Sequence, residues 1–401
     1  MEMMAATPYR YAERMDRLKS SAIRELLKLT ERPSVISLAG GLPAPELFPV
    51  AEFAEACAEV LRDDGPVALQ YSTTEGYPPL RQWVCDHLYA SNGLETTPDR
   101  VLIVSGSQQG VDLVSKVLLD PGDYVVIENP SYLGAIQAFD AYQAAYLDVA
   151  TDDAGMVPAD LERVLATAPR KPKLIYVIPN FSNPTGITTS LERRKAIVAI
   201  ARDHGIPLFE DDPYGRLRYS GEAIPSLAAI ACGDGVIYAG TASKTIAPGM
   251  RIAWLVLPDG ELHDKVVMAK QSADLHTSTF AQRAVYAYAK QPGAVDAHVA
   301  KMVPVYRGRR DAMVAELTAR LPSGWTWAYP DGGLFLWLRA PAGVDTTELL
   351  KRALEHEVAF VPGAPFWVSR DVRNTLRLSF SNSPEARIVE GITRLAAAIR
   401  D

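Results

Sequence analysis

Hydrophobic residues in the middle of the chain form short continuous runs, separated by longer segments with helical spacing. Six such runs, rich in β-branched and aliphatic residues, occur along this part of the chain. They occupy residues 101–106, 123–130, 173–179, 206–212, 236–243 and 251–258. Strands that are apolar along their whole length are buried on both faces, which is typical of a mostly parallel sheet with helices on each side. The pattern therefore predicts an α/β fold.

Helical spacing of apolar residues predicts the elements between and around these strands. Helices are expected over residues 107–119 and 131–139, and over residues 50–65, where Gly65 would end the helix. The first thirty or so residues also have roughly helical spacing. Residues 33–49 are interrupted by Pro and Gly and are expected to be irregular.

The pattern changes near residue 300, which indicates a second domain. Residues 301–321 predict a long amphipathic helix, and residues 332–340 and 375–380 predict strands of a smaller sheet. We therefore expect a large domain, a small C-terminal domain, and an N-terminal helix with an irregular segment that packs against the small domain and the active site. These three regions are residues 51–300, 301–401 and 1–50, respectively.

Composition narrows the class of protein. The 401 residues are 48% hydrophobic and 22% charged, which is ordinary for a globular protein with a sizeable core. A formal net charge of -7 argues against nucleic acid or an anionic membrane as the main partner. No secretory leader or membrane span is indicated, and the three cysteines form no CxxC pair. We expect a cytoplasmic enzyme without a bound metal.

Polar side chains follow several of the predicted strands, at the edge where ligands bind in open α/β sheets. Ser105, Gly106, Ser107 and Gln108 would open a helix whose free N–H groups suit a phosphate. Small residues at such a position can equally cap a helix for stability alone. Asn183 precedes a proline in another loop, where it could hydrogen-bond a ring hydroxyl or only shape a turn.

Two adjacent acids, Asp211 and Asp212, end an apolar strand. A carboxylate delivered there by an apolar strand needs a cationic partner. A metal would need further carboxylates or histidines nearby, and the six histidines show no ligand spacing. A protonated heterocyclic nitrogen is therefore the better partner.

The stretch TASKTIAPGMR, residues 241–251, follows a further strand. Thr241 and Ser243 supply hydroxyls, and Arg251 supplies a planar cation suited to phosphate. Lys244 lies among them, and a partly desolvated lysine near cations becomes a nucleophilic amine. A solvated loop lysine is the default interpretation of any single lysine. Together, however, the strand-end segments match one ligand, pyridoxal phosphate, whose binding needs a lysine and an acidic partner for the ring nitrogen.

Other motifs fit less well. TASK is only a partial match to the S-x-x-K nucleophile motif, because it begins with Thr and no S-D-N or K-T-G element accompanies it. Neither a Walker loop nor G-x-G-x-x-G is present.

The order of these motifs resembles the fold-type I pyridoxal-phosphate aminotransferases over nearly the whole chain, and is most similar to the 2-aminoadipate aminotransferase-like group. The matching segments are AIRELLKLTERPSVISLAGGLPAPELFP, ALQYSTTEGYPPLR, SGSQQGVDLVSKV, ENPSYLGAIQAF, ADLHTSTFAQ and VAFVPGAPF. The resemblance implies a large domain with a mostly parallel seven-stranded sheet between helices, plus a smaller α+β domain.

The resemblance also implies a role for each polar residue near the ring of the cofactor. Lys244 would bond to the cofactor aldehyde and then move a proton at the substrate carbon. Asp211 would keep the pyridine nitrogen protonated, and Asn183 and Tyr214 would hydrogen-bond the ring hydroxyl O3′. Tyr132 would stack on the ring, with simple packing as the alternative.

Phosphate binding is implied for a further group of residues. They are Ser107, Gln108, Thr241, Ser243 and Arg251. Tyr71 would reach the phosphate bound by the partner subunit, which implies a homodimer with active sites at the subunit interface.

Substrate binding is implied for Arg377, whose fork would hold the α-carboxylate, and a structural salt bridge is the alternative. The backbone of Gly40 would lie against the same carboxylate, with Asn183 and Tyr71 close by. Arg24, on the predicted N-terminal helix, would meet an acidic substrate side chain, or would pair with a nearby acid on an exposed helix.

Two segments depart from the family pattern. GTASK stands where relatives often have a serine and an aromatic residue before the Ser-Lys pair, and Pro213 stands where a small residue is commoner. Neither departure removes a reacting group, but both leave the shape of the substrate pocket open.

The implied activity is transfer of an amino group between an L-amino acid and a 2-oxo acid by a ping-pong mechanism, in which the cofactor alternates between pyridoxal and pyridoxamine phosphate. The donor would be 2-aminoadipate, a branched-chain or an aromatic amino acid, with 2-oxoglutarate and glutamate as the common pair. A decarboxylase, β-lyase or racemase would use the same Lys-Asp-Asn set. A ligand-sensing domain of a MocR-type regulator is a further alternative, but it would follow a DNA-binding domain larger than the roughly 35 residues before SLAGGLP.

Overall fold

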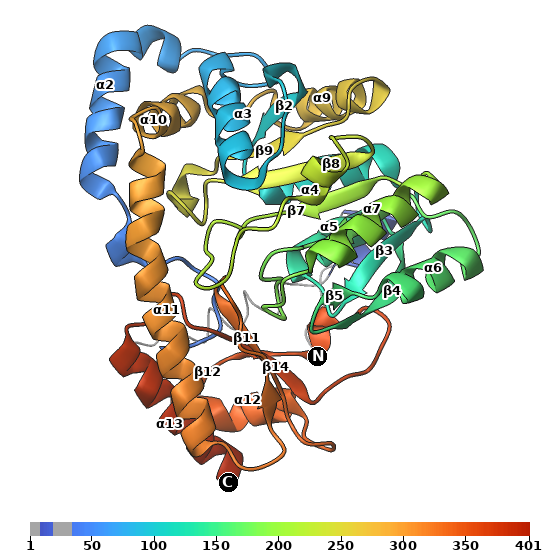
Figure 1. The fold of residues 1–401 in the computed structure, drawn as a ribbon, viewed down its shortest axis with the longest axis vertical. Coiled ribbons are helices and arrows are strands. Elements are labelled where there is room, and N and C mark those ends of the chain that lie inside the picture. Colours follow the sequence, from blue (N-terminus) through green and yellow to red (C-terminus); the bar gives the residue numbers. More distant parts are fainter. Residues whose placement is uncertain (1–8, 19–33) are drawn as a thin grey trace.

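The central sheet has eight strands in a computed structural model, which describes residues 9–18 and 34–401 (Figure 1). In spatial order the strands are β2 (Val101–Val104), β9 (Ala253–Val256), β8 (Val236–Thr241), β7 (Leu208–Asp211), β6 (Leu174–Val177), β3 (Tyr124–Asn129), β4 (Ala145–Asp152) and β5 (Gly155–Met156). The pairs from β8 to β4 are parallel, whereas β9 and β5 run antiparallel to their neighbours.

All six predicted apolar runs are confirmed as strands of this sheet. β2, β6, β7, β8 and β9 are buried along their whole length, as continuous apolar runs require. The sheet has one strand more than the expected seven, because the two-residue β5 adds an antiparallel edge beyond β4. Only one residue of β4 is fully buried, so that strand has no continuous apolar run.

Helices cover both faces of the sheet and enclose two separate cores. Alternate residues of β2 enter different cores, Leu102 and Val104 one of them and Val101 and Ile103 the other. The first core includes α4 (Ser107–Leu118), α5 (Leu133–Ala141) and α9 (Glu261–Asp274). The second includes α2 (Val50–Ala68), α3 (Pro78–Asn92), α6 (Pro158–Thr167), α7 (Leu191–His204), α8 (Leu227–Ile230) and α10 (Thr279–Ala289).

A smaller, antiparallel sheet lies at the other end of α11 (Ala294–Arg320), the long helix that descends beside both sheets (Figure 1). Its strands, in order, are β10 (Thr326–Trp327), β11 (Phe335–Arg339), β14 (Thr375–Ser379) and β13 (Val361–Pro362). α12 (Thr346–Glu355) and α13 (Glu385–Arg400) accompany it. β1 (Ile36–Ser37) pairs with β12 (Val358–Ala359), so a segment near the N-terminus adds to this C-terminal region. The exact domain boundaries stay a prediction.

Two predicted helices differ from the structure. α2 does not end at Gly65 but continues to Ala68, with a break at Asp64 (φ -127°, ψ 15°). Pro66 then lies in the first turn of the new helical segment, where no N–H is needed, so the helix resumes. Of the helix expected in the first thirty residues, Glu13–Asp16 form a 3-10 turn, and residues 19–33 lie outside the described residues.

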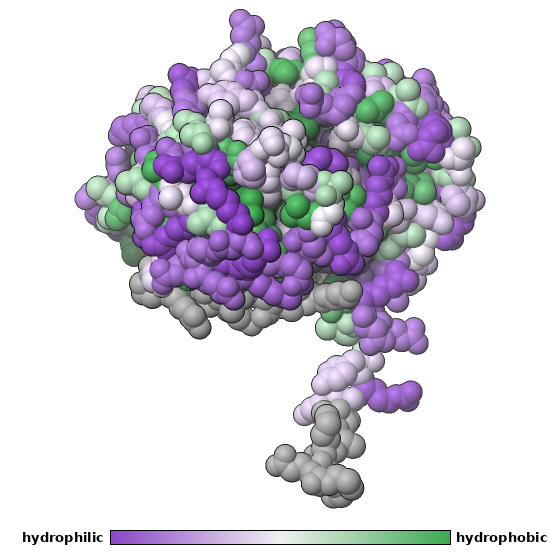
Figure 2. Space-filling view, turned by 90° about the horizontal axis from the view of Figure 1, so that it is seen from below, coloured by the Kyte–Doolittle hydropathy of each residue, from purple (hydrophilic) through white to green (hydrophobic). Residues whose placement is uncertain are grey.

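Within the described ranges, no helix is long and apolar enough to cross a membrane. Figure 2 shows that hydrophilic residues dominate the face seen from below, with apolar residues scattered between them.

Candidate active site

A cavity of about 320 Å³ lies at the carboxyl ends of the central strands and reaches the smaller sheet. Eleven of the predicted site residues line it: Ser107, Gln108, Tyr132, Asn183, Asp211, Tyr214, Thr241, Ser243, Lys244, Arg251 and Arg377. A larger cleft of about 670 Å³ borders β4, β10 and β11 and contains none of these residues. The chemistry-bearing side chains therefore converge on the smaller cavity.

Lys244 follows β8 and points its amine into this cavity, where Nζ donates a hydrogen bond to the carbonyl of Gly41 at 2.9 Å. Burial, with a further contribution from the nearby cations of Arg377 and Arg251, lowers the pKa of Lys244 to about 8. The amine can thus lose its proton near neutral pH and act as a nucleophile or base. A side chain at Gly41 would collide with the ring of Phe335.

Asp211 ends β7 with a carboxylate that is only half satisfied. Oδ2 accepts a hydrogen bond from the hydroxyl of Tyr176 at 2.7 Å, whereas the buried Oδ1 has no partner among the described residues. Burial raises the pKa of Asp211 to about 7, with a smaller contribution from Asp212, and the Tyr176 hydrogen bond opposes the rise. An unpartnered, buried carboxylate oxygen at a cavity fits a cationic ring nitrogen, which would restore its charge balance.

The two acids next to Asp211 point to the opposite side of the sheet. Glu210 lies within β7, and Asp212 directly follows it. Glu210 accepts from the backbone N–H groups of Leu227 and Ala228, each at 2.9 Å. Asp212 accepts from Tyr238 at 3.2 Å. The period of two along a strand therefore leaves Asp211 as the acid at the cavity.

Arg377, on β14, is 1% exposed and has no carboxylate partner among the described residues. Nη1 donates to Oδ1 of Asn183 and Nη2 to the carbonyl of Ala39, both at 2.7 Å, while Nε has no partner. Its guanidinium carbon lies 4.2 Å from the ring centre of Phe335 and 5.3 Å from that of Phe366. Burial lowers the pKa of Arg377 to about 10. A buried cation held by neutral groups can receive an anion, and the salt-bridge alternative has no acid among the described residues.

An anion cradle forms where α4 begins. Gly106 has φ +90°, and a side chain there would collide with the guanidinium of Arg251. Nη2 of Arg251 donates to the carbonyl of Ser105 at 3.3 Å. Ser107 is the first residue of α4, so the free N–H groups and positive dipole end of that helix face the same place.

The hydroxyl pair beside this cradle is locally organised. Oγ1 of Thr241 lies 3.0 Å from Oγ of Ser243 and accepts from the Ser243 backbone N–H at 3.1 Å. Gln108 also lines the cavity, but its amide Nε2 donates to the carbonyl of Gly134 at 2.7 Å.

Two tyrosines, Tyr132 and Tyr214, line the cavity. Tyr132 directly precedes α5, and burial raises the pKa of its hydroxyl. Tyr214 is buried, packs edge-on against Phe335 and hydrogen-bonds Asn183; its burial raises the pKa of its hydroxyl. Both hydroxyls therefore stay protonated and can donate hydrogen bonds.

Two predicted residues within the described ranges do not line this cavity. Tyr71 is 79% exposed, and its ring meets the edge of His276 at 5.8 Å. Gly40 does not line the cavity, whereas the next residue, Gly41, does. Arg24 lies outside the described residues.

Sequence reasoning did not single out Tyr176 or Phe335. Both lie within apolar strands, where an aromatic residue is normally part of the core. Only their contacts in the structure, of Tyr176 with Asp211 and of Phe335 with Arg377, link them to the site. Trp367 does not line this cavity, and its Nε1 donates to the Thr375 hydroxyl at 3.2 Å.

Comparison with known proteins agrees with this geometry. The family model "Aminotransferase class I and II" matches residues 33–395. The chain is 43% identical to aromatic-amino-acid aminotransferase 1 of Thermococcus litoralis, over 98% of this chain and 94% of that protein. The solved structure of Pyrococcus horikoshii kynurenine aminotransferase in complex with PMP superposes with a TM-score of 0.92 at 41% identity, covering 97% of this chain and 96% of the other. The α-aminoadipate aminotransferase of Thermus thermophilus, complexed with N-(5'-phosphopyridoxyl)-L-leucine, gives a TM-score of 0.90 at 42% identity, covering 97% of each chain.

The chain belongs to the class I and II aminotransferases. Within them it falls in the aminoadipate-like group, as a pyridoxal-phosphate-dependent transaminase of fold type I.

Proposed function

We propose that this transaminase moves the amino group of an L-amino acid with an acidic or aromatic side chain to a 2-oxo acid in two half-reactions, with 2-oxoglutarate and glutamate as the common pair. The observation that supports this proposal most directly is one cavity lined by both Arg377 and Lys244. Arg377 is buried without a carboxylate partner among the described residues, and the pKa of the Lys244 amine is lowered. Relatives named for aromatic amino acids, kynurenine and 2-aminoadipate support these donor classes.

The residues at the cavity fit the cofactor. The unpartnered Oδ1 of Asp211 would hold the ring nitrogen, Tyr132 would lie against the ring, and Asn183 and Tyr214 would hydrogen-bond its hydroxyl. The residues that would hold the phosphate are Ser107, Gln108, Thr241, Ser243 and Arg251. Once bound, pyridoxal phosphate supplies an electron-poor ring that takes up the electron pair released at the substrate carbon.

Two side chains would then act on the substrate, Arg377 and Lys244, and a third, Asp211, on the cofactor ring. Arg377 would bind its α-carboxylate and fix the orientation of the α-carbon. The neutral amine of Lys244 would take the proton from the substrate α-carbon and return it at C4′ of the cofactor, because its lowered pKa lies near neutral pH. The carboxylate of Asp211 would keep its charge opposite the cationic ring nitrogen. Arg24 and the backbone at Gly40 stay predictions for substrate binding.

We further propose that two copies of the chain form the active unit, in the cytoplasm. Tyr71 is highly exposed, and so are the nearby apolar side chains of Leu69 and Val67, at 79%, 74% and 55%. Such a cluster beside the end of α2 is suited to a subunit contact, through which Tyr71 would reach the partner's phosphate site. The three cysteines of the chain are free, which suits a reducing compartment.

The test is a half-reaction without a 2-oxo acid. The holoenzyme is mixed with single L-amino acids, namely 2-aminoadipate, glutamate, phenylalanine, kynurenine and leucine, and the absorbance of the bound cofactor is followed. We expect conversion to the pyridoxamine form by acidic or aromatic donors, and its reversal by 2-oxoglutarate.

Release of carbon dioxide or of a side-chain fragment, without the pyridoxamine form, would instead support a decarboxylase or lyase. Conversion by leucine alone would contradict the proposed donors while leaving transamination intact. The variant R377Q is the control for substrate binding, because it should bind the cofactor normally and convert slowly.

A further inference from the structure

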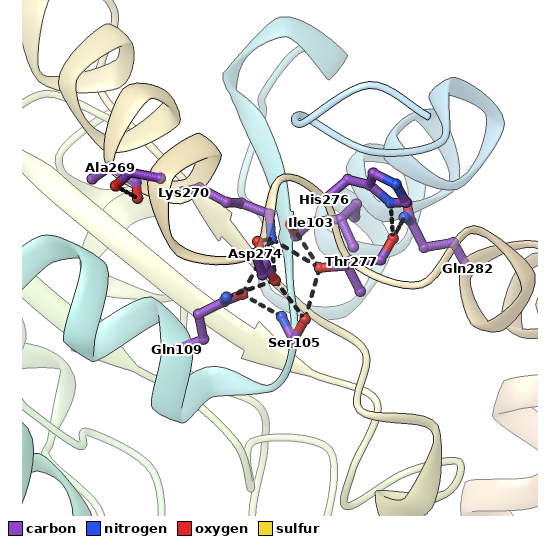
Figure 3. Close-up of polar contacts among 10 residues, drawn as sticks. Ile103, Ser105, Gln109, Ala269, Lys270, Asp274, His276, Thr277 and Gln282 are labelled. Carbon is purple, nitrogen blue, oxygen red and sulfur yellow. Dashed lines mark hydrogen bonds and ion pairs between the residues drawn. The ribbon is translucent and has the colours of Figure 1, made fainter. Parts of the chain in front are cut away.

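A buried cation lies behind the anion cradle and takes no part in the chemistry described above. Lys270, on α9, has a fully buried side chain at 0% exposure. Its Nζ lies 2.7 and 2.9 Å from the two carboxylate oxygens of Asp274, 3.1 Å from the Thr277 hydroxyl and 3.2 Å from Oε1 of Gln109. Figure 3 shows these groups gathered around the amine, between α9 and the start of α4.

The partners of Lys270 all converge on one residue, Ser105. Its backbone N–H donates to Oε1 of Gln109 at 2.7 Å, and its hydroxyl lies 3.1 Å from both Oδ2 of Asp274 and Oγ1 of Thr277. Gln109 also donates from Nε2 to Asp274 at 2.7 Å. The network therefore takes up the N–H and the hydroxyl of Ser105, whereas its carbonyl bonds a residue outside the network.

That carbonyl belongs to the cradle. It accepts the hydrogen bond from Arg251, and Ser105 is followed directly by the glycine and serine that open α4. Ser105 is thus held on one side by the Lys270 network and bears on the other side the backbone from which the cradle is built. A displacement of Ser105 would move Arg251 and the first N–H groups of α4 together.

Stability alone does not explain a charged pair at this position. Burial lowers the pKa of Lys270, and its carboxylate partner Asp274 opposes that shift. The side chain of Lys270 is fully buried, whereas that of Asp274 is 26% exposed. Replacing buried charged groups by apolar residues is often neutral or stabilising, so we attribute to this pair a role in orienting the neighbouring groups.

We propose that Lys270 is a positioning residue for the phosphate group of pyridoxal phosphate, acting through Gln109, Asp274 and Ser105 on the cradle formed by Arg251 and the N-terminus of α4. The inference rests on the proposed assignment of that cradle to the phosphate. In this proposal Lys270, although it lies outside the cavity, contributes to the affinity of the protein for the phosphate group.

The experiment compares two ligands that differ only in the phosphate ester. The full-length protein is stripped of cofactor, and its Kd values for pyridoxal phosphate and for pyridoxal are measured by absorbance. For the variant K270M we expect a rise of about tenfold or more in the Kd of pyridoxal phosphate, with little change for pyridoxal. The hydrogen bonds that K270M removes support only the groups expected to bind the phosphate, which pyridoxal lacks. K270R, which retains the charge, should recover part of the preference for the phosphate ester.

The matched control is K116M. Lys116 also joins α4 to α9, through a 3.1 Å hydrogen bond to Ser272, but it is exposed and touches no part of the Ser105 network. Its loss should leave both Kd values unchanged. D274N provides a second route into the same network if K270M does not fold, and it should weaken pyridoxal phosphate selectively as well.

The variant R251Q tests the assignment of the cradle to the phosphate separately from the positioning role of Lys270. If R251Q leaves the preference for the phosphate ester intact, the assignment of the cradle to the phosphate is wrong. If R251Q abolishes the preference but K270M and D274N weaken both ligands equally, or neither, the network is structural only and the positioning role of Lys270 is overturned.

Discussion

Removing the hydroxyl of Tyr176 should change the protonation of Asp211 without altering the shape of the site. In wild type this hydroxyl donates to Oδ2 at 2.7 Å and opposes the effect of burial, and the pKa of Asp211 is raised to about 7 with both effects present. A hydrogen bond to a charged group is worth about 1.5–3 kcal/mol, and one pKa unit corresponds to about 1.36 kcal/mol. The variant Y176F should therefore move the protonation midpoint of Asp211 upward by about one to two pH units.

The sign of the effect follows from the acid form. Below its midpoint Asp211 is neutral and cannot balance a cationic ring nitrogen, so cofactor affinity should fall on the acid side. In Y176F this loss should begin at higher pH than in wild type. The assay is the Kd of pyridoxal phosphate for the cofactor-free protein, measured across the neutral range, together with the acid limb of kcat/KM.

The next acid along the chain, Asp212, provides a matched control. Tyr238 donates in the same manner to Asp212, at 3.2 Å, on the side of the sheet away from the cavity. Y238F should therefore leave the acid-side midpoint close to that of wild type. If Y176F moves the midpoint no further than Y238F does, the view that Tyr176 tunes Asp211 is refuted.

Three further changes test other parts of the site. G106A should lower the free energy of unfolding by about 1–3 kcal/mol, because φ +90° suits only glycine, and should weaken cofactor binding because the new side chain would collide with Arg251. Thermal unfolding measures the first effect and cofactor titration the second. An unchanged Kd would contradict the assignment of this cradle to the phosphate. R377Q should reduce kcat/KM for amino acids by an amount equivalent to about 2–5 kcal/mol while leaving the cofactor Kd unchanged; a loss confined to kcat would speak against carboxylate binding. In the cofactor-free protein, acylation of Lys244 should rise with pH around a midpoint of about 8, since burial and Arg377 disfavour its charged form, whereas a midpoint near the ordinary lysine value of about 10.4 would contradict the burial argument.

Much of the central sheet could be predicted, because strands buried on both faces have continuous apolar runs that few other elements share. β4 lacked that signal. Most of its residues are only partly buried, and Asp148 within it pairs with Arg370 at 2.8 Å. The end of α2 was misplaced for a related reason, since Gly65 and Pro66 are strong local breakers that tertiary packing overrides.

The candidate site was predictable where each polar residue directly follows a strand, as Asp211 and Lys244 do. Partners that reach the site from distant parts of the chain were not, because nothing in the local pattern marks them. The contact between Lys244 and the Gly41 carbonyl joins residues 203 positions apart. The position of Tyr71 relative to the site also cannot be judged from one chain, because Tyr71 is expected to contact the site of a second copy.

The two ends of the cavity are supplied by different parts of the chain. The groups suited to the cofactor stand on the central sheet and α4, whereas Arg377 and Phe335 stand on β14 and β11 of the smaller sheet, next to the strand that residues 36–37 join. Asn183 bridges the two through its bond to Arg377. We therefore expect substitutions in the smaller sheet to alter substrate binding, while the groups suited to the cofactor stay in place. Such a separation would allow substrate binding to change while the cofactor site is kept.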